Sequence, residues 1–486
     1  MTLYKRVLKN SSIYMVSNII QRFLAFILLP LYTRFLTPDD YGIVAVVSSL
    51  VITLEILFMF SLGGAITKFY FEYKDNPPEL KRFYGTVFLF LFIVSVTLST
   101  ISIIFGPVFL SPFLDKIEFY PYMAVAIAGL FFFPVYDLYL NMLQTEERTV
   151  EFSIVTISCF VFKTILSIIF VVGMKNGAIG PIAAESISNL IFFAVAFVRI
   201  RKKITFTIDI KYLKTALAYS IPLLPHTLVT QIKHIADKLF LNSMIGTAAA
   251  GIYNIGFQIG NLTAVIAMAI NRAYIPVFME SMKSQEKESL EKLKKLSAFL
   301  VFFYCTFSFV LSIFSREVII VLTTEKYYQA YLVVPFIAFS FAARGIYFLF
   351  VNTLFFYEKK TKLVAVISIL TAALNIALNY SFIKLFSISG AAAATMTSQI
   401  AATVFTAYIA HKYSMISWEY IKYAAVFSLS IVLSLLINRE TVLDFFQLLV
   451  IKSVVSVCYF AFCSFIFWKE PFYIFKNWKR LGLFGK

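Results

Sequence analysis

Residues 28–47, LLPLYTRFLTPDDYGIVAVV, join two apolar runs through only a few polar residues. Pro30 removes a helix hydrogen bond and so shapes the end of the first run, where Arg34 stands close to the polar turn. The TPDD sequence that follows caps a second helix and puts acids at the positive end of its dipole. Gly42 then allows close packing of that second helix. The stretch therefore predicts two apolar helices joined by a short turn.

This apolar character extends over the whole chain. Of its 486 residues, 60% are hydrophobic and only 14% are charged, and the mean hydropathy is +0.84. These values lie outside the range of soluble globular domains. The apolar runs recur from end to end and are each long enough to cross roughly 30 Å of hydrocarbon as a helix, and they lack the strict alternation of barrel strands. The sequence predicts an all-α integral membrane protein.

We expect about fourteen transmembrane helices. The predicted spans lie at about 11–34, 41–64, 85–110, 121–143, 152–174, 179–198, 215–241, 247–271, 297–322, 329–352, 363–384, 389–410, 419–437 and 446–468. The basic N-terminal stretch has no small-residue cleavage site, so we interpret it as a retained first helix.

The basic residues predict the orientation. With an even number of spans both termini share one side, and roughly 28 lysines and arginines fall in segments on that side against roughly 7 on the other. This bias places both termini in the cytoplasm and Arg34 at the outer interface. The net charge of +17 is spread over short loops beside anionic lipid, so it does not indicate a partner among nucleic acids.

An internal repeat divides the chain. GAIGPIAAESISNL, from Gly177, matches SISGAAAATMTSQI, from Ser387, and Gly42 in YGIV matches Gly251 in AGIY at nearly the same offset. A third match aligns Asn141 with Asn352. These matches predict two homologous six-helix lobes that run parallel to each other around a central cavity and are related by an axis along the membrane normal. The predicted domains are an N-terminal lobe (1–205), a C-terminal lobe (206–412), and two extra helices with a basic cytoplasmic tail (413–486).

Three stretches resemble a known family. They are LPLYTRFLTPDDYGIVAVV, then YSIPLLPHTLVTQIKHIADKLFLNSMIG followed by AGIYNIGFQIGN, and LNIALNYSFIKLFSISGAAAATMTS. Together they resemble the polysaccharide-exporter, or O-antigen flippase, branch of the multidrug/oligosaccharidyl-lipid/polysaccharide (MOP) superfamily. The resemblance covers about residues 5–412 and implies two six-helix bundles around a V-shaped cavity.

The resemblance also implies a function. It indicates a flippase that moves polyprenyl-diphosphate-linked oligosaccharide repeat units across the bacterial cytoplasmic membrane by alternating access, for surface polysaccharide biosynthesis. The partners would be that lipid-linked glycan, membrane lipids and the glycan polymerase or glycosyltransferases of the same route. The four cysteines lie inside apolar spans without C-x-x-C spacing, and we predict no cofactor and no metal site.

Polar residues inside the spans are candidate substrate ligands, because an ionisable group in hydrocarbon is costly unless it faces protein or water. A diphosphate must lose water while crossing, so fixed cations and amides are the groups that replace its hydration. The candidates for substrate binding are Arg22, Asn18, Lys163, Lys233, His226, Asn254, Gln258, Asn261 and Arg344. For Arg22 the alternative is a structural ion pair with Glu55 or another carboxylate.

Four acids are candidates for ion coupling or for charge pairing: Glu55, Asp137, Glu185 and Asp237. Any of them could carry a coupling proton or sodium ion, or neutralise a neighbouring cation in a structural pair. Lys452 is expected to snorkel or to face a neighbouring helix. Because the buried cations outnumber these acids, we expect a cation-rich cavity.

Three other functions are alternatives to the flippase. An enzyme of glycan assembly would need a sizeable outer loop, and the loops are short; nucleotide-binding and metalloprotease motifs are also absent from the sequence. We therefore predict a protein that is not an enzyme. A multidrug/cation antiporter of the same superfamily would be favoured by an acidic cavity. A flippase for the peptidoglycan-precursor lipid would have a closely related fold.

Overall fold

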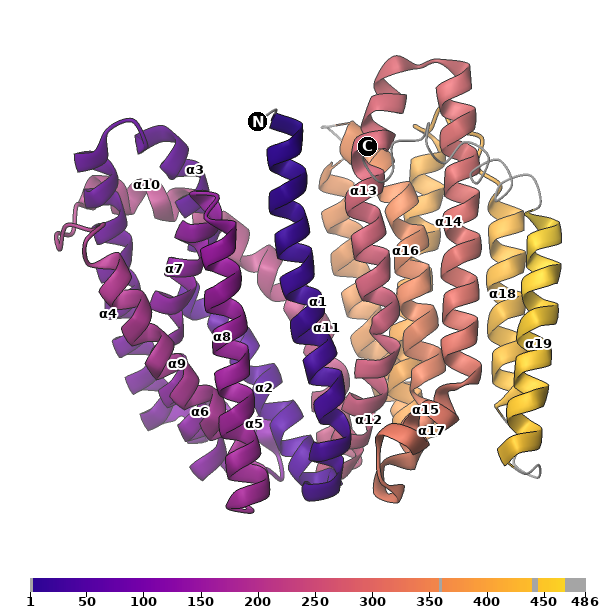
Figure 1. Cartoon of the computed structure of the whole chain (residues 1–486), viewed down its shortest axis with the longest axis horizontal. Coiled ribbons are helices and arrows are strands. Elements are labelled where there is room, and N and C mark those ends of the chain that lie inside the picture. Colours follow the sequence, from indigo (N-terminus) through magenta and orange to yellow (C-terminus); the bar gives the residue numbers. More distant parts are fainter. Residues whose placement is uncertain (1–2, 358–360, 439–444, 468–486) are drawn as a thin grey trace. The chain divides into compact units, whose positions relative to one another are not determined.

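The computed structural model describes residues 3–357, 361–438 and 445–467, and every regular element in these ranges is a helix (Figure 1). Eleven helical stretches of the described chain are long and apolar enough to cross a membrane. One of them, Leu363–His411, holds two predicted spans, because Ser387 interrupts it with a φ of 54°. The other two predicted spans lie in α1 and in α10 with α11. The all-α membrane fold is confirmed.

The chain forms two compact units, Met1–Gly251 and Ile252–Lys486. In the first, α9 packs against α6, α7 and α8, while α1 packs on α8 and α11 on α2. A core of aromatic and aliphatic side chains, including Phe69, Phe83 and Tyr139, joins α3, α4 and α7. The helices of this unit are α1 (Leu3–Phe35), α2 (Pro38–Met59), α3 (Leu62–Tyr73), α4 (Pro77–Phe109), α5 (Ser111–Leu114), α6 (Ala124–Leu130), α7 (Phe133–Thr145), α8 (Thr149–Ile168), α9 (Ile179–Ile200), α10 (Ile210–Ser220) and α11 (Leu224–Met244).

The second unit is built around α16, which packs against α13, α14 and α17, while α18 and α19 pack on α14. Its core includes Phe309, Phe339 and Tyr459. The helices are α13 (Leu262–Ser284), α14 (Lys287–Ile313), α15 (Ser315–Leu322), α16 (Val334–Phe356), α17 (Thr361–His411), α18 (Tyr420–Ile437) and α19 (Phe445–Ile466). Helix α12 (Thr247–Gly260) begins in the first unit and ends in the second.

The division into compact units differs from the repeat boundary that the sequence predicts after residue 205. Helices α10 and α11 follow that boundary, yet α10 packs on α3 and α4, and α11 packs on α2. Both therefore belong to the first compact unit. The unit boundary reports packing and the repeat boundary reports sequence similarity, so the predicted lobes stay a prediction.

The turn between α1 and α2 is held by a capping box. The Thr37 hydroxyl accepts a hydrogen bond from the Asp40 amide at 3.1 Å, and the Asp40 carboxylate accepts one from the Thr37 amide at 3.0 Å. The other Asp40 oxygen accepts a hydrogen bond from the Ala178 amide, at 3.0 Å, beside the start of α9. The predicted cap is confirmed, and the same carboxylate ties α2 to α9.

The two glycines that the repeat aligns lie against each other at the first turns of α2 and α12. A Cβ on Gly42 would lie 1.9 Å from the Thr247 carbonyl oxygen, and a Cβ on Gly251 would lie 2.2 Å from the Pro38 carbonyl oxygen. Thr247 precedes Gly251 by one helical turn, as Pro38 precedes Gly42. The contact is therefore reciprocal, and each glycine permits the backbone of the other helix to approach.

A buried ion pair attaches α19 to the rest of the second unit. The Lys452 ammonium lies 2.7 and 2.9 Å from the two carboxylate oxygens of Glu317 in α15, and the side chains are only 1% and 8% exposed. The Tyr459 and Ser430 hydroxyls share a hydrogen bond of 2.5 Å between α19 and α18. Lys452 thus faces a neighbouring helix, one of the two positions that the sequence predicts.

Candidate functional site

Four helices of the first unit each contribute one ionisable side chain to a polar cluster in the membrane-spanning region. The residues are Glu55 from α2, Asp137 from α7, Lys163 from α8 and Glu185 from α9. The charge of Glu55 interacts with the charges of the other three. We call these four residues the charged cluster. The structure therefore brings together four of the residues that the sequence singles out.

Lys163 and Glu185 form an ion pair within the charged cluster. The Lys163 ammonium donates a hydrogen bond to a Glu185 carboxylate oxygen at 2.8 Å. The side chains remain 37% and 46% exposed, so the pair is accessible from outside the protein core. Helix α9 follows α8 in the chain and packs against it, which brings these two residues to the same level. The pair is therefore not enclosed by protein on all sides.

Asp137 is oriented by its own helix. The Asn141 side-chain amide donates hydrogen bonds to the Asp137 carboxylate and to its backbone carbonyl oxygen, both at 2.8 Å. Gly63 leaves the space that Asn141 occupies, because a Cβ there would lie 2.9 Å from the amide oxygen. Asn141 is absent from the predicted site residues. Its match with Asn352 in the repeat was the available signal.

The charge balance differs from the expected cation-rich cavity. In the charged cluster, three carboxyl groups stand beside one lysine. The sequence prediction counted cations and acids over all spans, whereas the packing of α2, α7, α8 and α9 decides which of them meet. The acids therefore outnumber the cation in this cluster, while the expected cation-rich cavity between the lobes stays a prediction.

The other predicted site residues of the first unit lie apart from these interactions or outside the described residues. Arg22 is exposed on α1 and is not among the charges that interact with Glu55, which leaves the proposed Arg22–Glu55 pair without support. Asp237 is buried on α11, with only 3% of its surface exposed. The side chains of Asn18, His226 and Lys233 lie outside the described residues.

The remaining candidates belong to the second unit. Asn254 is half-buried and Gln258 is exposed on α12, while Asn261 stands at the junction of α12 and α13. The Arg344 guanidinium in α16 is half-buried and lies 5.9 Å from the centre of the Phe348 ring. These four residues stay predicted ligands.

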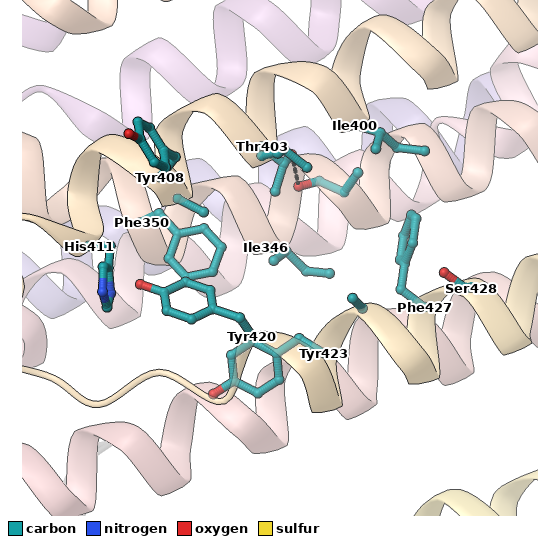
Figure 2. Close-up of a pocket in the computed structure, with 14 residues that line it drawn as sticks. Ile346, Phe350, Ile400, Thr403, Tyr408, His411, Tyr420, Tyr423, Phe427 and Ser428 are labelled. Atoms are coloured by element: carbon teal, nitrogen blue, oxygen red, sulfur yellow. Dashed lines mark hydrogen bonds between the residues drawn. The ribbon is translucent and has the colours of Figure 1, made fainter.

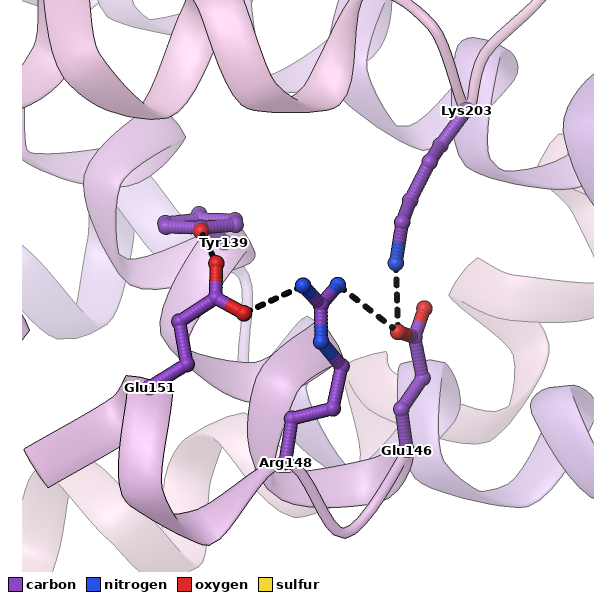
Figure 3. Close-up of polar contacts among 5 residues, drawn as sticks. All are labelled: Tyr139, Glu146, Arg148, Glu151 and Lys203. Carbon is purple, nitrogen blue, oxygen red and sulfur yellow. Dashed lines mark hydrogen bonds and ion pairs between the residues drawn. The ribbon is translucent and has the colours of Figure 1, made fainter.

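A second polar network holds the ends of the helices that carry the charged cluster (Figure 3). Arg148, at the start of α8, contacts Glu146 at 3.5 Å and forms a close ion pair with Glu151. Lys203, which follows α9, also pairs with Glu146, and the Tyr139 hydroxyl of α7 donates a hydrogen bond to Glu151 at 2.5 Å. Together these contacts fix α7, α8 and α9 relative to one another.

Arg148→Ala is expected to destabilise the protein by about 0.5–1 kcal/mol, because the lost ion pairs are partly exposed and partly screened. A double-mutant cycle with Glu151→Ala should show coupling of the same order. The measurement is unfolding of the purified protein in detergent, with Arg201→Ala, at an exposed neighbouring position, as control. Equal effects of the two arginine variants would show that the network does not hold the helices.

The fold is that of transporters of the multidrug/oligosaccharidyl-lipid/polysaccharide superfamily. It is similar to the lipid II flippase MurJ in an inward closed conformation, with a TM-score of 0.75 and 16% identity, over 94% of this chain and 99% of that one. It is also similar to an inward-facing multidrug resistance MATE family transporter, with a TM-score of 0.65 and 14% identity, over 83% and 95% of the chains.

The sequence matches the polysaccharide biosynthesis protein family over residues 7–282 and the MatE family over residues 222–381. The chain therefore belongs to the polysaccharide biosynthesis protein family. A relative from Haemophilus influenzae, "Lsg locus putative protein 1", is 22% identical over 384 residues, which cover 76% of this chain and 90% of that protein. The predicted superfamily is confirmed.

Proposed function

We propose that this protein is a flippase that carries polyprenyl-diphosphate-linked oligosaccharides across the bacterial cytoplasmic membrane by alternating access. The membership in a polysaccharide biosynthesis family supports a glycan cargo. The accessible Lys163–Glu185 pair is the observation that carries the proposal, because it offers a cation to an anionic headgroup inside a membrane-spanning region.

The pair suggests how an anion is bound. In the structure the positive charge of Lys163 is balanced by Glu185. A diphosphate carries roughly two negative charges and competes with the carboxylate for the ammonium group. When the diphosphate takes Lys163, Glu185 loses its partner in the ion pair. Binding of the headgroup thereby rearranges the charges of the cluster.

The rest of the proposed arrangement follows from the sequence. Both termini lie in the cytoplasm, in agreement with the excess of basic residues on that side. The protein acts as a carrier without chemical catalysis, and it receives its cargo from glycosyltransferases and delivers it to a polymerase. The lipid tail stays in the bilayer while the glycan crosses.

The test is reconstitution in liposomes with a polyprenyl-diphosphate-linked oligosaccharide, whose arrival at the outer leaflet is read with a reagent that does not cross the membrane. Lys163→Gln is expected to lower the initial rate about tenfold, since the loss of one charge-assisted contact is worth about 1.4 kcal/mol. Lys163→Arg should retain most of the rate, because it keeps the charge.

Lys292→Gln is the matched control, because it removes a lysine that pairs with Glu288 in α14, far along the chain from the charged cluster. All variants are compared at equal amounts of reconstituted protein. If the unaltered protein does not move the glycolipid, or if Lys163→Gln moves it as fast, the proposed role is wrong.

A second candidate is supported by the excess of acids in the charged cluster. Three carboxyl groups beside one lysine are suited to a cationic cargo or a coupling cation, as in a multidrug/cation antiporter. The same liposomes, loaded with a cationic dye and given a proton gradient, test this role. Dye efflux that is lost in Glu55→Gln, without glycolipid movement, would favour the antiporter.

A flippase for peptidoglycan-precursor lipid is tested in the same liposomes by replacing the polyprenyl-diphosphate-linked oligosaccharide with that precursor lipid.

A further inference from the structure

A groove in the second unit is bordered by α16, α17 and α18 and encloses about 450 Å³ (Figure 2). Small residues on all three helices make the space: Ala343, Ala407 and Ala424. Exposed Val404 and Tyr408 lie on its α17 side, so the groove opens on the surface of membrane-spanning helices. Its occupant must therefore be something that the bilayer can supply.

The two ends of the groove differ in chemistry. Figure 2 shows His411, Tyr408 and Tyr420 toward one end, and Ile400 and Phe427, with the small hydroxyl residue Ser428 beside them, toward the other. The Tyr420 hydroxyl is buried and has no hydrogen-bond partner among the described residues. The groove thus suits an amphiphile, with its polar part near the tyrosines and its apolar part along Ile400 and Phe427.

A cation stands beside the polar end. The exposed Lys412 ammonium lies 5.0 Å from the centre of the Tyr408 ring. Basic pockets between transmembrane helices are suited to anionic lipid headgroups, and a lysine near the membrane surface contributes about 1 kcal/mol to such binding. The charge therefore favours an amphiphile with a negatively charged head.

The level of the groove in the membrane indicates which kind of amphiphile fits it. His411 is the last residue of α17 and Tyr420 is the first residue of α18, so the polar end lies where the chain leaves the two membrane-spanning helices. Tyrosines are enriched at that level of a membrane. A phospholipid that keeps its headgroup at the interface meets the polar end with its head and the apolar end with an acyl chain.

We propose that the groove between α16, α17 and α18 binds an anionic glycerophospholipid of the surrounding bilayer, with its phosphate beside Lys412 and one acyl chain along Phe427. This lipid stays in place and is distinct from any transported cargo. It fills a space that packing of the three helices leaves open, and so stabilises the attachment of α18 to α16 and α17.

The test uses the full chain in nanodiscs and counts retained phosphatidylglycerol and phosphatidylcholine by native mass spectrometry. Ala407→Phe fills the groove and is expected to weaken phosphatidylglycerol binding about tenfold, equivalent to losing the burial of roughly two methylene groups. Lys412→Gln should reduce the preference for phosphatidylglycerol about fivefold, through the loss of about 1 kcal/mol.

Val366→Phe is the control, because it adds the same ring at an exposed position of α17 that does not border the groove. Thermal unfolding checks that each variant is folded. The proposal is overturned if Ala407→Phe retains as much phosphatidylglycerol as the control. It is also overturned if polyprenyl phosphate displaces the bound lipid, which would make the groove a site for the cargo's tail. Neither readout depends on transport.

Discussion

Gly42→Ala is expected to abolish export and to lower stability by about 1–3 kcal/mol, the usual cost of overpacking. The added methyl group would lie 1.9 Å from the carbonyl oxygen of Thr247, which is a backbone atom and cannot rotate away. Helices α2 and α12 would have to separate at their first turns. Alanine is a better helix former than glycine by about 1 kcal/mol. A loss of stability would therefore come from crowding of the two helices, and a gain would come from helix propensity. Thermal unfolding and complementation of an export-deficient strain measure the two effects.

Gly173→Ala is the control for this prediction, because a Cβ at Gly173 would have no neighbour within 4 Å. Gly251→Ala should behave like Gly42→Ala, since the contact is reciprocal and its added methyl group would meet the Pro38 carbonyl oxygen at 2.2 Å. Normal export and unchanged stability in both Gly42→Ala and Gly251→Ala would show that the two helices do not need this close approach.

Lys452→Met is expected to destabilise the second unit by about 3–5 kcal/mol, because it leaves the Glu317 carboxylate buried without its partner. Both side chains are almost completely enclosed, so water cannot take the place of the lysine. The effect should appear as a lower denaturation midpoint of the purified protein. It should be much larger than that of Lys384→Met, which removes an exposed lysine in α17.

The double variant Lys452→Met with Glu317→Leu sharpens this experiment. Replacing both members of a buried pair by apolar residues of similar size is often neutral or stabilising, so stability should return to near the original value. If the single and double variants are equally unstable, the loss comes from packing of α19 and the ion pair contributes little.

The sequence predicts best those features that depend on neighbouring residues. Helix length and apolar composition predict the spans, and TPDD predicts the cap that Thr37 and Asp40 form. The pairing of Lys163 with Glu185 could also have been predicted from the sequence. The turn between α8 and α9 lies near residue 175, so the two side chains stand at similar distances from it on antiparallel helices.

The features that the sequence could not predict depend on which helices touch. Lys163 alone indicates a free cation, yet its surroundings contain three acids, because α2, α7 and α9 turn those residues toward it. The Arg148 network required knowing that the loop after α9 comes back to the start of α8. The lipid groove depends on alanines that are unremarkable in an apolar span. The substrate-binding roles of His226 and Lys233 remain predictions.

The carboxylate of Asp40 has a consequence for how this scaffold can change over evolutionary time. It ties the start of α2 to the start of α9, and the Arg148 network ties α7, α8 and α9 near the other ends of α8 and α9. The frame is thus held at its two margins by contacts that do not involve Glu55, Asp137 or Glu185. These three acids can therefore change charge, and with it the cargo, without breaking either set of contacts.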